Sequence, residues 1–258
     1  MTLIENSHFI QQLSKRDLQL RIRSSFLGAL WLIIQPLMLL IMYSFVFGGI
    51  FKSRWPNSNG VHFIFIFYSG YLVYNLIADT VIRATPSMIH HSNLVKTGVF
   101  PVEVIPWAIL VSNMFNFIIN VALVLALFLF TYGDIPLTVL FLPILLLPLT
   151  LFIMGASLLA ASINVYIRDL ENLMNLLFVI LLFGTPIFYS LEIVPTPYDM
   201  LLKLNPLCFF VASMRDLLCF GNLPELLSYA WATILYGVFY WISLLVFRKL
   251  RKGFGDLL

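Results

Sequence analysis

Side chains able to do chemistry are few in this sequence, and the most suggestive ones lie at helical spacing inside a long apolar run. Tyr68, Tyr71, Asn75 and Asp79 fall within about 80° of one another at 100° per residue. Arg83 follows Asp79 at i+4, a spacing that lets a carboxylate and a guanidinium meet. The stripe predicts either a hydrated, aromatic-lined conduit or hydrogen bonds between helices, and the sequence favours neither.

A second polar stripe, in a later apolar run, consists of amides alone. Asn113, Asn116 and Asn120 lie within about 60° of one another on a helix. Because asparagine commonly joins helices by hydrogen bonds in membrane bundles, we interpret this stripe as helix packing rather than as a binding site.

Motifs for nucleotide, metal and hydrolase chemistry are missing from the sequence. It has no G-x-x-x-x-G-K-[ST], no H-E-x-x-H, no G-x-S-x-G and no D-x-D. The adjacent His90 and His91 point in different directions on a helix, so they do not predict a metal site. We therefore expect no catalytic residue, no metal and no cofactor on this chain, which is not predicted to be an enzyme.

Long apolar helices must position these side chains. Of the 258 residues, 61% are hydrophobic and 10% are charged, whereas a soluble domain has about 25% charged residues. The composition predicts an all-α integral membrane protein, with six transmembrane helices read from the apolar runs and their breakers. The predicted spans are 27–51, 61–82, 104–131, 137–166, 171–190 and 226–247.

Basic residues set the orientation of these spans. Eleven of the 15 Lys and Arg residues fall in cytoplasmic segments if the N-terminus is inside, in agreement with the positive-inside rule. We expect a multi-pass protein of the inner (cytoplasmic) membrane with both termini cytoplasmic. The bases lie beside apolar runs rather than in one patch, so nucleic acid is not an expected partner.

The two ends of the chain are expected to contact the membrane surface. Residues 1–25 predict an amphipathic helix, with Phe9, Leu13 and Leu20 on one face. The basic run 248–252 suits an anionic inner leaflet.

The segment 191–225 is rich in proline and contains an apolar stretch too short to span. It predicts short re-entrant helices that dip in from outside, with an ordinary external loop as the alternative. We expect Arg215 and Asp216 to face water, and Cys208 and Cys219 to be reduced, buried thiols.

Several short motifs occur in order along the whole chain. They are KRDLQLRIR at 15–23, LGALW at 27–31, QPL at 35–37, NLVK at 93–96, FP at 100–101, YIRD at 166–169, TPIFY at 185–189, NPL at 205–207 and the dipeptide RD at 215–216. Together they resemble the permeases of type 2 ATP-binding-cassette exporters, in the branch that exports O-antigen, capsule and teichoic-acid polymers. The chain departs from many relatives in carrying Val102 and Glu103 after the Phe-Pro pair.

The resemblance implies a single permease domain over 1–258 that exports a lipid-linked polysaccharide. It implies a homodimer working with two separate ATPase subunits, which would hold the ATP and Mg. The interface helix 1–25 and a coupling segment 84–101 would contact the ATPase, and 191–222 would form an outer gate.

The residues assigned on this basis fall into four groups. They are Asn93, Leu94, Lys96, Phe100 and Pro101 for ATPase coupling; Tyr43, Tyr68, Tyr71 and Tyr189 for channel lining; Asp79 and Arg83 as an intramembrane charge pair; and Pro186, Pro195, Asn205, Pro206 and Arg215 for the outer gate. Two alternatives stay open: a drug or small-lipid exporter permease of the same superfamily, and an ion-gradient-driven secondary transporter using Asp79.

Overall fold

The computed structural model describes residues 7–23, 27–50, 55–56, 58, 60–96, 101–196 and 198–258. The regular secondary structure of these ranges is helical, and they contain no strand. In chain order the helices are α1 Ser7–Arg23, α2 Trp31–Tyr43, α3 Phe63–Ala84, α4 Ser87–His90, α5 Ser92–Lys96, α6 Val104–Tyr132, α7 Leu142–Tyr166, α8 Leu170–Phe183, α9 Tyr198–Lys203, α10 Pro206–Arg215, α11 Leu226–Leu250 and α12 Phe254–Leu257. Short 3-10 or π turns extend four of them, at Gly28–Leu30 and Ser44–Ile50 around α2, Leu137–Phe141 before α7, Asp216–Phe220 after α10 and Arg251–Gly253 after α11.

Five helical stretches within the described residues are long and apolar enough to cross a membrane. They are Gly28–Ile50, Phe63–Ala84, Val104–Tyr132, Leu137–Tyr166 and Leu226–Gly253. These stretches agree with five of the six predicted spans, and the all-α prediction is confirmed for the described ranges.

The predicted span 171–190 is not confirmed as one continuous helix, because α8 ends at Phe183. Gly184 follows the helix, and the buried Pro186 comes two residues later. Proline disfavours helical backbone in the residue before it and cannot donate a helical hydrogen bond. The 14-residue helix is about 21 Å long, which is shorter than the roughly 30 Å hydrocarbon core.

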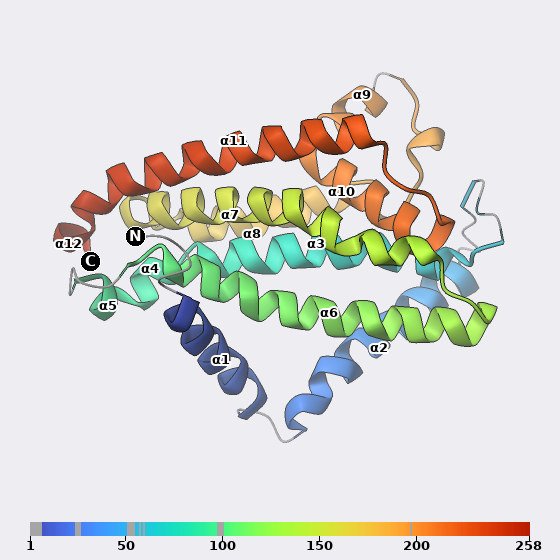
Figure 1. Ribbon diagram of the computed structural model, residues 1–258, viewed down its shortest axis with the longest axis horizontal. Helices are drawn as coiled ribbons and strands as arrows, with labels where there is room; N and C mark the ends of the chain where they lie inside the picture. The colour runs from blue at the N-terminus through green and yellow to red at the C-terminus, as the bar shows by residue number, and fades with distance from the viewer. Residues whose placement is uncertain are drawn as a thin grey trace.

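Helix α3 forms the centre of the bundle, and most of its residues are buried. Figure 1 shows α6 on one side of α3 and α7 on the other, with α11 lying along α7. Close packing of α7 on α11 depends on Gly155, where an added Cβ would lie 2.6 Å from ring carbons of Phe239. The small residues of this part of α7 thus serve helix packing.

The connecting segments gather at two opposite ends of the bundle (Figure 1). At one end, α4 and α5 lie near α12, and Glu103 at the start of α6 pairs with Arg251 at 3.2 Å and with Arg248 at 3.8 Å. At the other end, α6 terminates at Gly133, whose φ of 84° is the left-handed conformation that glycine adopts at helix C-termini. Helices α1 and α2 form the two arms of a V on the α6 side of the bundle, and both contact α6.

Candidate functional site

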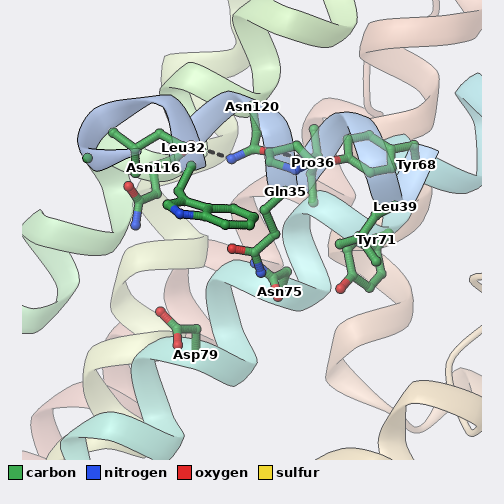
Figure 2. A pocket seen from close by; sticks show the side chains of 13 residues that line it. Leu32, Gln35, Pro36, Leu39, Tyr68, Tyr71, Asn75, Asp79, Asn116 and Asn120 are labelled. Carbon is green, nitrogen blue, oxygen red and sulfur yellow. Dashed lines mark hydrogen bonds between the residues drawn. The ribbon is translucent and has the colours of Figure 1, made fainter. Parts of the chain in front are cut away.

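A polar cavity of about 340 Å³ lies between α2, α3 and α6 (Figure 2). It is lined by Gly28, Trp31, Leu32, Gln35, Pro36, Leu39, Tyr68, Tyr71, Leu72, Asn75, Asp79, Asn116 and Asn120. A second space of about 40 Å³ shares five of these side chains and is also lined by Leu76, Asn113 and Phe117. The tyrosine stripe of α3 and the asparagine stripe of α6 therefore meet in one cavity.

One hydrogen bond between the two stripes and one within α6 hold one wall of this cavity in place. The Tyr68 hydroxyl donates to Asn120 Oδ1 over 3.1 Å, and Asn120 Nδ2 donates to the carbonyl of Asn116 over 2.7 Å. The Asn116 Oδ1 atom is buried and has no hydrogen-bond partner among the described residues. A buried acceptor without a donor costs free energy, and the residue that carries it lines the cavity.

Helix α2 forms a further wall of the cavity, in addition to α3 and α6, and the sequence analysis missed it. Trp31 and Gln35 are separated by one helical turn and line the cavity together with Pro36. Gln35 is the only amide or charged residue in 27–51, and a lone amide in an apolar run is a signal that could have identified this face. Amides and hydroxyls beside an indole ring suit a neutral, hydroxyl-rich ligand. No group of side chains that could hold a metal ion occurs in the part of the chain that the structure describes.

Two of the four tyrosines proposed as channel lining are not part of the cavity wall. Tyr43 packs in an aromatic cluster, with ring centroids 4.6 Å from Phe67 and 6.0 Å from Tyr71. The Tyr189 hydroxyl donates to the carbonyl of Phe183 over 2.9 Å, beyond the end of α8. Of the four tyrosines, only Tyr68 and Tyr71, both on α3, line the cavity.

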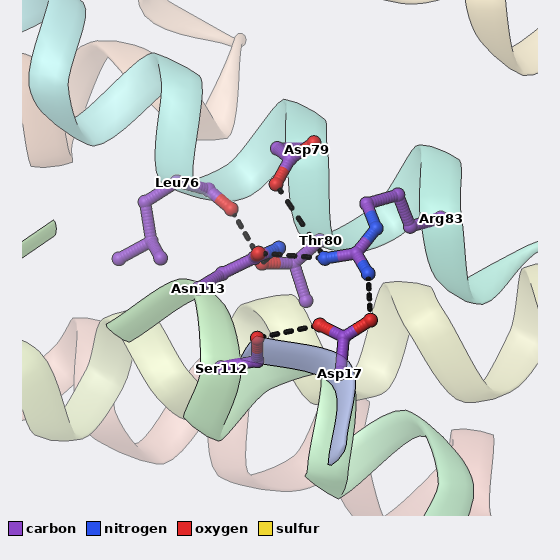
Figure 3. Close-up of polar contacts among 7 residues, drawn as sticks. All are labelled: Asp17, Leu76, Asp79, Thr80, Arg83, Ser112 and Asn113. Atoms are coloured by element: carbon purple, nitrogen blue, oxygen red, sulfur yellow. Dashed lines mark hydrogen bonds and ion pairs between the residues drawn. The ribbon is translucent and has the colours of Figure 1, made fainter. Parts of the chain in front are cut away.

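Near the C-terminal end of α3, Arg83 is bound to α6 by polar partners (Figure 3). Its Nη1 donates to Asn113 Oδ1 over 2.9 Å, and Asn113 Nδ2 donates to Thr80 Oγ1 over 3.0 Å. The proposed ionic partner is farther away, since Asp79 Oδ2 lies 3.9 Å from Arg83 Nη1. This contact is a loose ion pair, longer than a hydrogen bond.

The tight ionic partner of Arg83 is Asp17, which the sequence analysis did not identify. Arg83 Nη2 lies 2.6 Å from Asp17 Oδ1, and Ser112 Oγ donates to the other carboxylate oxygen over 2.5 Å. Asp17 therefore joins α1 to both α3 and α6 (Figure 3). A signal was present, because Asp17 follows Leu13 by four residues and precedes Leu20 by three. A carboxylate that interrupts an apolar helix face requires a partner.

The predicted coupling residues belong to the chain segment that connects α3 to α6. This segment lies at the end of the bundle that also holds α12 (Figure 1). Asn93 and Lys96 are exposed on α5, while Leu94 is half-buried. Pro101 is half-buried just before α6, and Phe100 lies outside the described residues. The coupling role of this surface stays a prediction.

Asn205 organises the beginning of α10 in the predicted outer segment. Its Oδ1 accepts a hydrogen bond from the backbone N–H of Leu207 over 3.0 Å, and Pro206 occupies the first turn. The Asn205 Nδ2 group donates to the Gly184 carbonyl over 3.0 Å and to Thr185 Oγ1 over 2.9 Å. One side chain thus caps α10 and attaches it to the turn after α8.

The remaining two prolines assigned to the gate lie in the connection from α8 to α9. Pro186 is buried in the turn after α8, whereas Pro195 is exposed. Pro186 therefore belongs to the packed part of this connection and Pro195 to its surface.

Arg215 does not face water, so the expectation for this residue is wrong. It is 5% exposed, because its guanidinium lies in a site built from three other segments. Its Nε donates to the Ile66 carbonyl over 3.1 Å, and its Nη2 donates to the Ile187 carbonyl over 2.9 Å. The guanidinium carbon lies 4.3 Å from the ring centroid of Trp55, a cation–π contact. Arg215 therefore fastens α10 to α3 and to the turn after α8.

Both cysteines of the outer segment are buried and unbridged. Burial raises the pKa of the Cys208 thiol to about 11 and that of Cys219 to about 12. Thiols with such pKa values are unreactive at neutral pH, as expected for cysteines that serve packing.

Comparison with known proteins supports the family that the motifs suggested. Residues 8–219 match the family described as ABC-2 type transporter. The O-antigen export system permease protein RfbA of Klebsiella pneumoniae is 29% identical over 251 residues, which cover 95% of this chain and 93% of the relative. A protein of the same name from Myxococcus xanthus is 28% identical over the same shares of both chains. Because the family match covers most of its length, this chain belongs to the ABC-2 type transporter family.

Proposed function

We propose that this chain is the pore-forming permease subunit of an ATP-driven exporter that moves a lipid-linked polysaccharide of the O-antigen type out of the cytoplasm. The observation that carries the proposal is the polar, aromatic-lined cavity between three apolar helices, in a chain that matches O-antigen export permeases over 95% of its length.

The chemistry of the cavity suits a sugar chain. Trp31 and Tyr71 present aromatic faces on which the C–H surface of a sugar ring can pack. Gln35, Asn75 and Asn116 supply amides that both donate and accept, so they can pair with hydroxyls in different arrangements. A binding site of this kind holds successive sugars without requiring one hydroxyl pattern.

The membrane topology belongs to this proposal. Helix α8 with the turn 184–190 would form the fifth of six crossings, and α10 would be a re-entrant helix entering from outside. Support comes from the basic residues, eleven of 15 on the proposed cytoplasmic side. The short α8 and the buried turn after it are compatible with a crossing completed by non-helical backbone packed against protein. Both termini would be cytoplasmic, in the inner membrane.

The partners are also proposed: a second copy of the chain and two ATPase subunits, which would bind the ATP and Mg. The sequence has no P-loop of its own. The exposed Asn93 and Lys96 on α5, together with α1, supply the surface for the ATPase contact. The outer segment, held by Asn205 and Arg215, would gate the exit.

Export in cells that lack their own permease tests the proposal. The chain is expressed with its ATPase, and surface polysaccharide is measured with an antibody against the polymer. Trp31→Leu and Asn116→Leu should each lower export about tenfold, the effect of losing about 1.4 kcal/mol of interaction. Trp241→Leu is the matched control, because this exposed residue of α11 lies outside the cavity lining.

Three outcomes would contradict the proposal. Normal export by both cavity variants would remove the cavity from the transport path. Export without the ATPase would favour a gradient-driven transporter. Movement of drugs or free lipids, with no effect on surface polysaccharide, would favour the other exporters of the superfamily.

A further inference from the structure

Arg83 lies between two carboxylates that belong to different parts of the molecule (Figure 3). Asp17 on α1 is 2.6 Å from Nη2, whereas Asp79 on α3 is 3.9 Å from Nη1. The first distance is that of a charge-assisted hydrogen bond, and the second is about 1 Å too long for one. In this structure the guanidinium is therefore shared unequally, in favour of α1.

The contacts that hold α1 in place are different from the contact that holds Arg83 to α6. Asp17 holds α1 through Arg83 and through Ser112 Oγ, which donates to it over 2.5 Å. Asn113 accepts from Arg83 over 2.9 Å and donates to Thr80, so this contact lies wholly between α3 and α6. If α1 moved away, Arg83 would keep its bond to Asn113 and lose its bond to Asp17.

Asp79 is the nearest carboxylate that could replace Asp17, and it lines the cavity. Its side chain is 41% exposed and borders both the larger and the smaller cavity spaces. A movement of the guanidinium by about 1 Å would bring it within hydrogen-bonding distance of Asp79. The exchange would tighten the ion pair at the cavity wall without leaving Arg83 unpaired, which matters where unpaired charge is costly.

The position of α1 makes it suitable for transmitting such a change. It packs along α6, and Leu13 and Asp17 share a groove of about 120 Å³ with His91 and Ile105. His91 lies between α4 and α5, in the predicted coupling segment. A force applied to this end of the molecule would therefore act on the helix that carries Asp17.

We propose that Arg83 is a relay between α1 and the cavity: when α1 is displaced, its guanidinium transfers from Asp17 to Asp79 and so changes how tightly the carboxylate at the cavity wall is paired. Asp17 and Arg83 are positioning residues in this mechanism, because neither side chain needs to contact the transported molecule. The relay rests on the proposed function, since the displacing force comes from the ATPase partner.

A cysteine reporter in the cavity tests the relay. Asn75→Cys is introduced with Cys208→Ala and Cys219→Ala, and the complex with the ATPase is purified in detergent. The rate of labelling by a small charged thiol reagent is measured at rest and with the ATPase trapped by a non-hydrolysable nucleotide. We expect the two rates to differ about fivefold or more, the lower end of typical coupling between sites.

Variants at the two carboxylates then separate the relay from simple packing. Asp17→Asn should remove the difference between the two states and fix the rate at its trapped value, while Asp17→Glu should restore a difference. Asp79→Asn should also remove the difference, although it leaves the bond between Asp17 and Arg83 intact. If Asp17→Asn does not assemble with the ATPase, the Asp79→Asn result decides.

Two results would overturn the relay. Full nucleotide dependence in Asp17→Asn or in Asp79→Asn would show that the cavity responds by another route, with the export function unaffected. Equal labelling in both states of the parent complex would also overturn it, and the export assay would then judge the proposed function separately.

Discussion

Replacing Arg215 with methionine should release the outer segment from its place against α3. The substitution keeps a long side chain but removes the charge and every hydrogen-bond donor. In the structure those donors reach the carbonyls of Ile66 and Ile187, and the guanidinium covers Trp55. Three attachments of α10 are therefore lost in one change.

The cost follows from what each partner retains. The Ile66 carbonyl still accepts from Ser69 Oγ over 2.9 Å, so its loss is small. Ile187 is fully buried in a non-helical turn, and losing a charged donor to its carbonyl costs about 1.5–3 kcal/mol. The Trp55 contact adds about 0.5–2 kcal/mol. Relief of the desolvation of a buried charge offsets part of the loss, which leaves about 2–3 kcal/mol net.

The native cysteines report this change directly. Cys208 and Cys219 are buried in the helix that Arg215 fastens, so a thiol reagent reaches them only when the segment opens. When opening and closing are fast, the labelling rate follows the open population. A loss of about 2–3 kcal/mol then predicts labelling about 30- to 150-fold faster than in the wild type. The measurement is made on purified protein that elutes as the wild type does.

Arg248→Met is the matched control for loss of an arginine. Its side chain is 56% exposed and 3.8 Å from Glu103, and surface ion pairs of this kind contribute about 1 kcal/mol or less. Labelling of both cysteines should stay within about twofold of the wild type in this control. The reasoning is refuted if Arg215→Met also stays within that range, or if both variants accelerate labelling equally.

Three further predictions use other contacts. Gly155→Ala should lower stability by about 1–3 kcal/mol, seen as a lower melting temperature, because its Cβ would lie 2.6 Å from an aromatic ring; Gly237→Ala, with its nearest atom at 4.0 Å, should not. Leu94→Asp should abolish export at an unchanged protein level, since a charge would enter a half-buried contact. Glu103→Gln removes ion pairs at 3.2 and 3.8 Å; it should lower the melting temperature slightly, and 1 M salt should abolish the difference from the wild type.

The five long spans could be predicted because lipid demands long, continuous apolar helices, and such runs are visible in sequence. The same logic did not predict where the helix within 171–190 ends. Apolar composition continues after Phe183, but Gly184 and Pro186 end the helix, and the residues after it are buried in a turn. Hydropathy measures burial in lipid or protein and does not distinguish a helix from a buried turn. The break signals were the better guide here.

The polar stripes of the candidate site could be predicted because each is a property of one helix. Their neighbours could not, because contacts between α2 and α3 or between α1 and α6 depend on how separate helices pack. Tyr43 shows the limit: its residue type suits a sugar channel, yet its ring packs on Phe67. Asn116 shows the converse, since the interpretation as helix packing left no role for its unpaired, buried Oδ1 atom.

In a chain with 10% charged residues, the arginines within or beside the bundle act as links between helices. Arg83 joins α1, α3 and α6, while Arg215 joins α10, α3 and the turn after α8. The two differ in what lies next to them. Arg215 donates its hydrogen bonds to backbone carbonyls of the packed bundle. Moving Arg215 would therefore separate its positive charge from those carbonyls. Arg83 has a second carboxylate 3.9 Å away and can exchange partners at small cost. If Arg83 acts as the proposed relay, α1 is the element that moves during a transport cycle, while α3 and α10 move together as one unit.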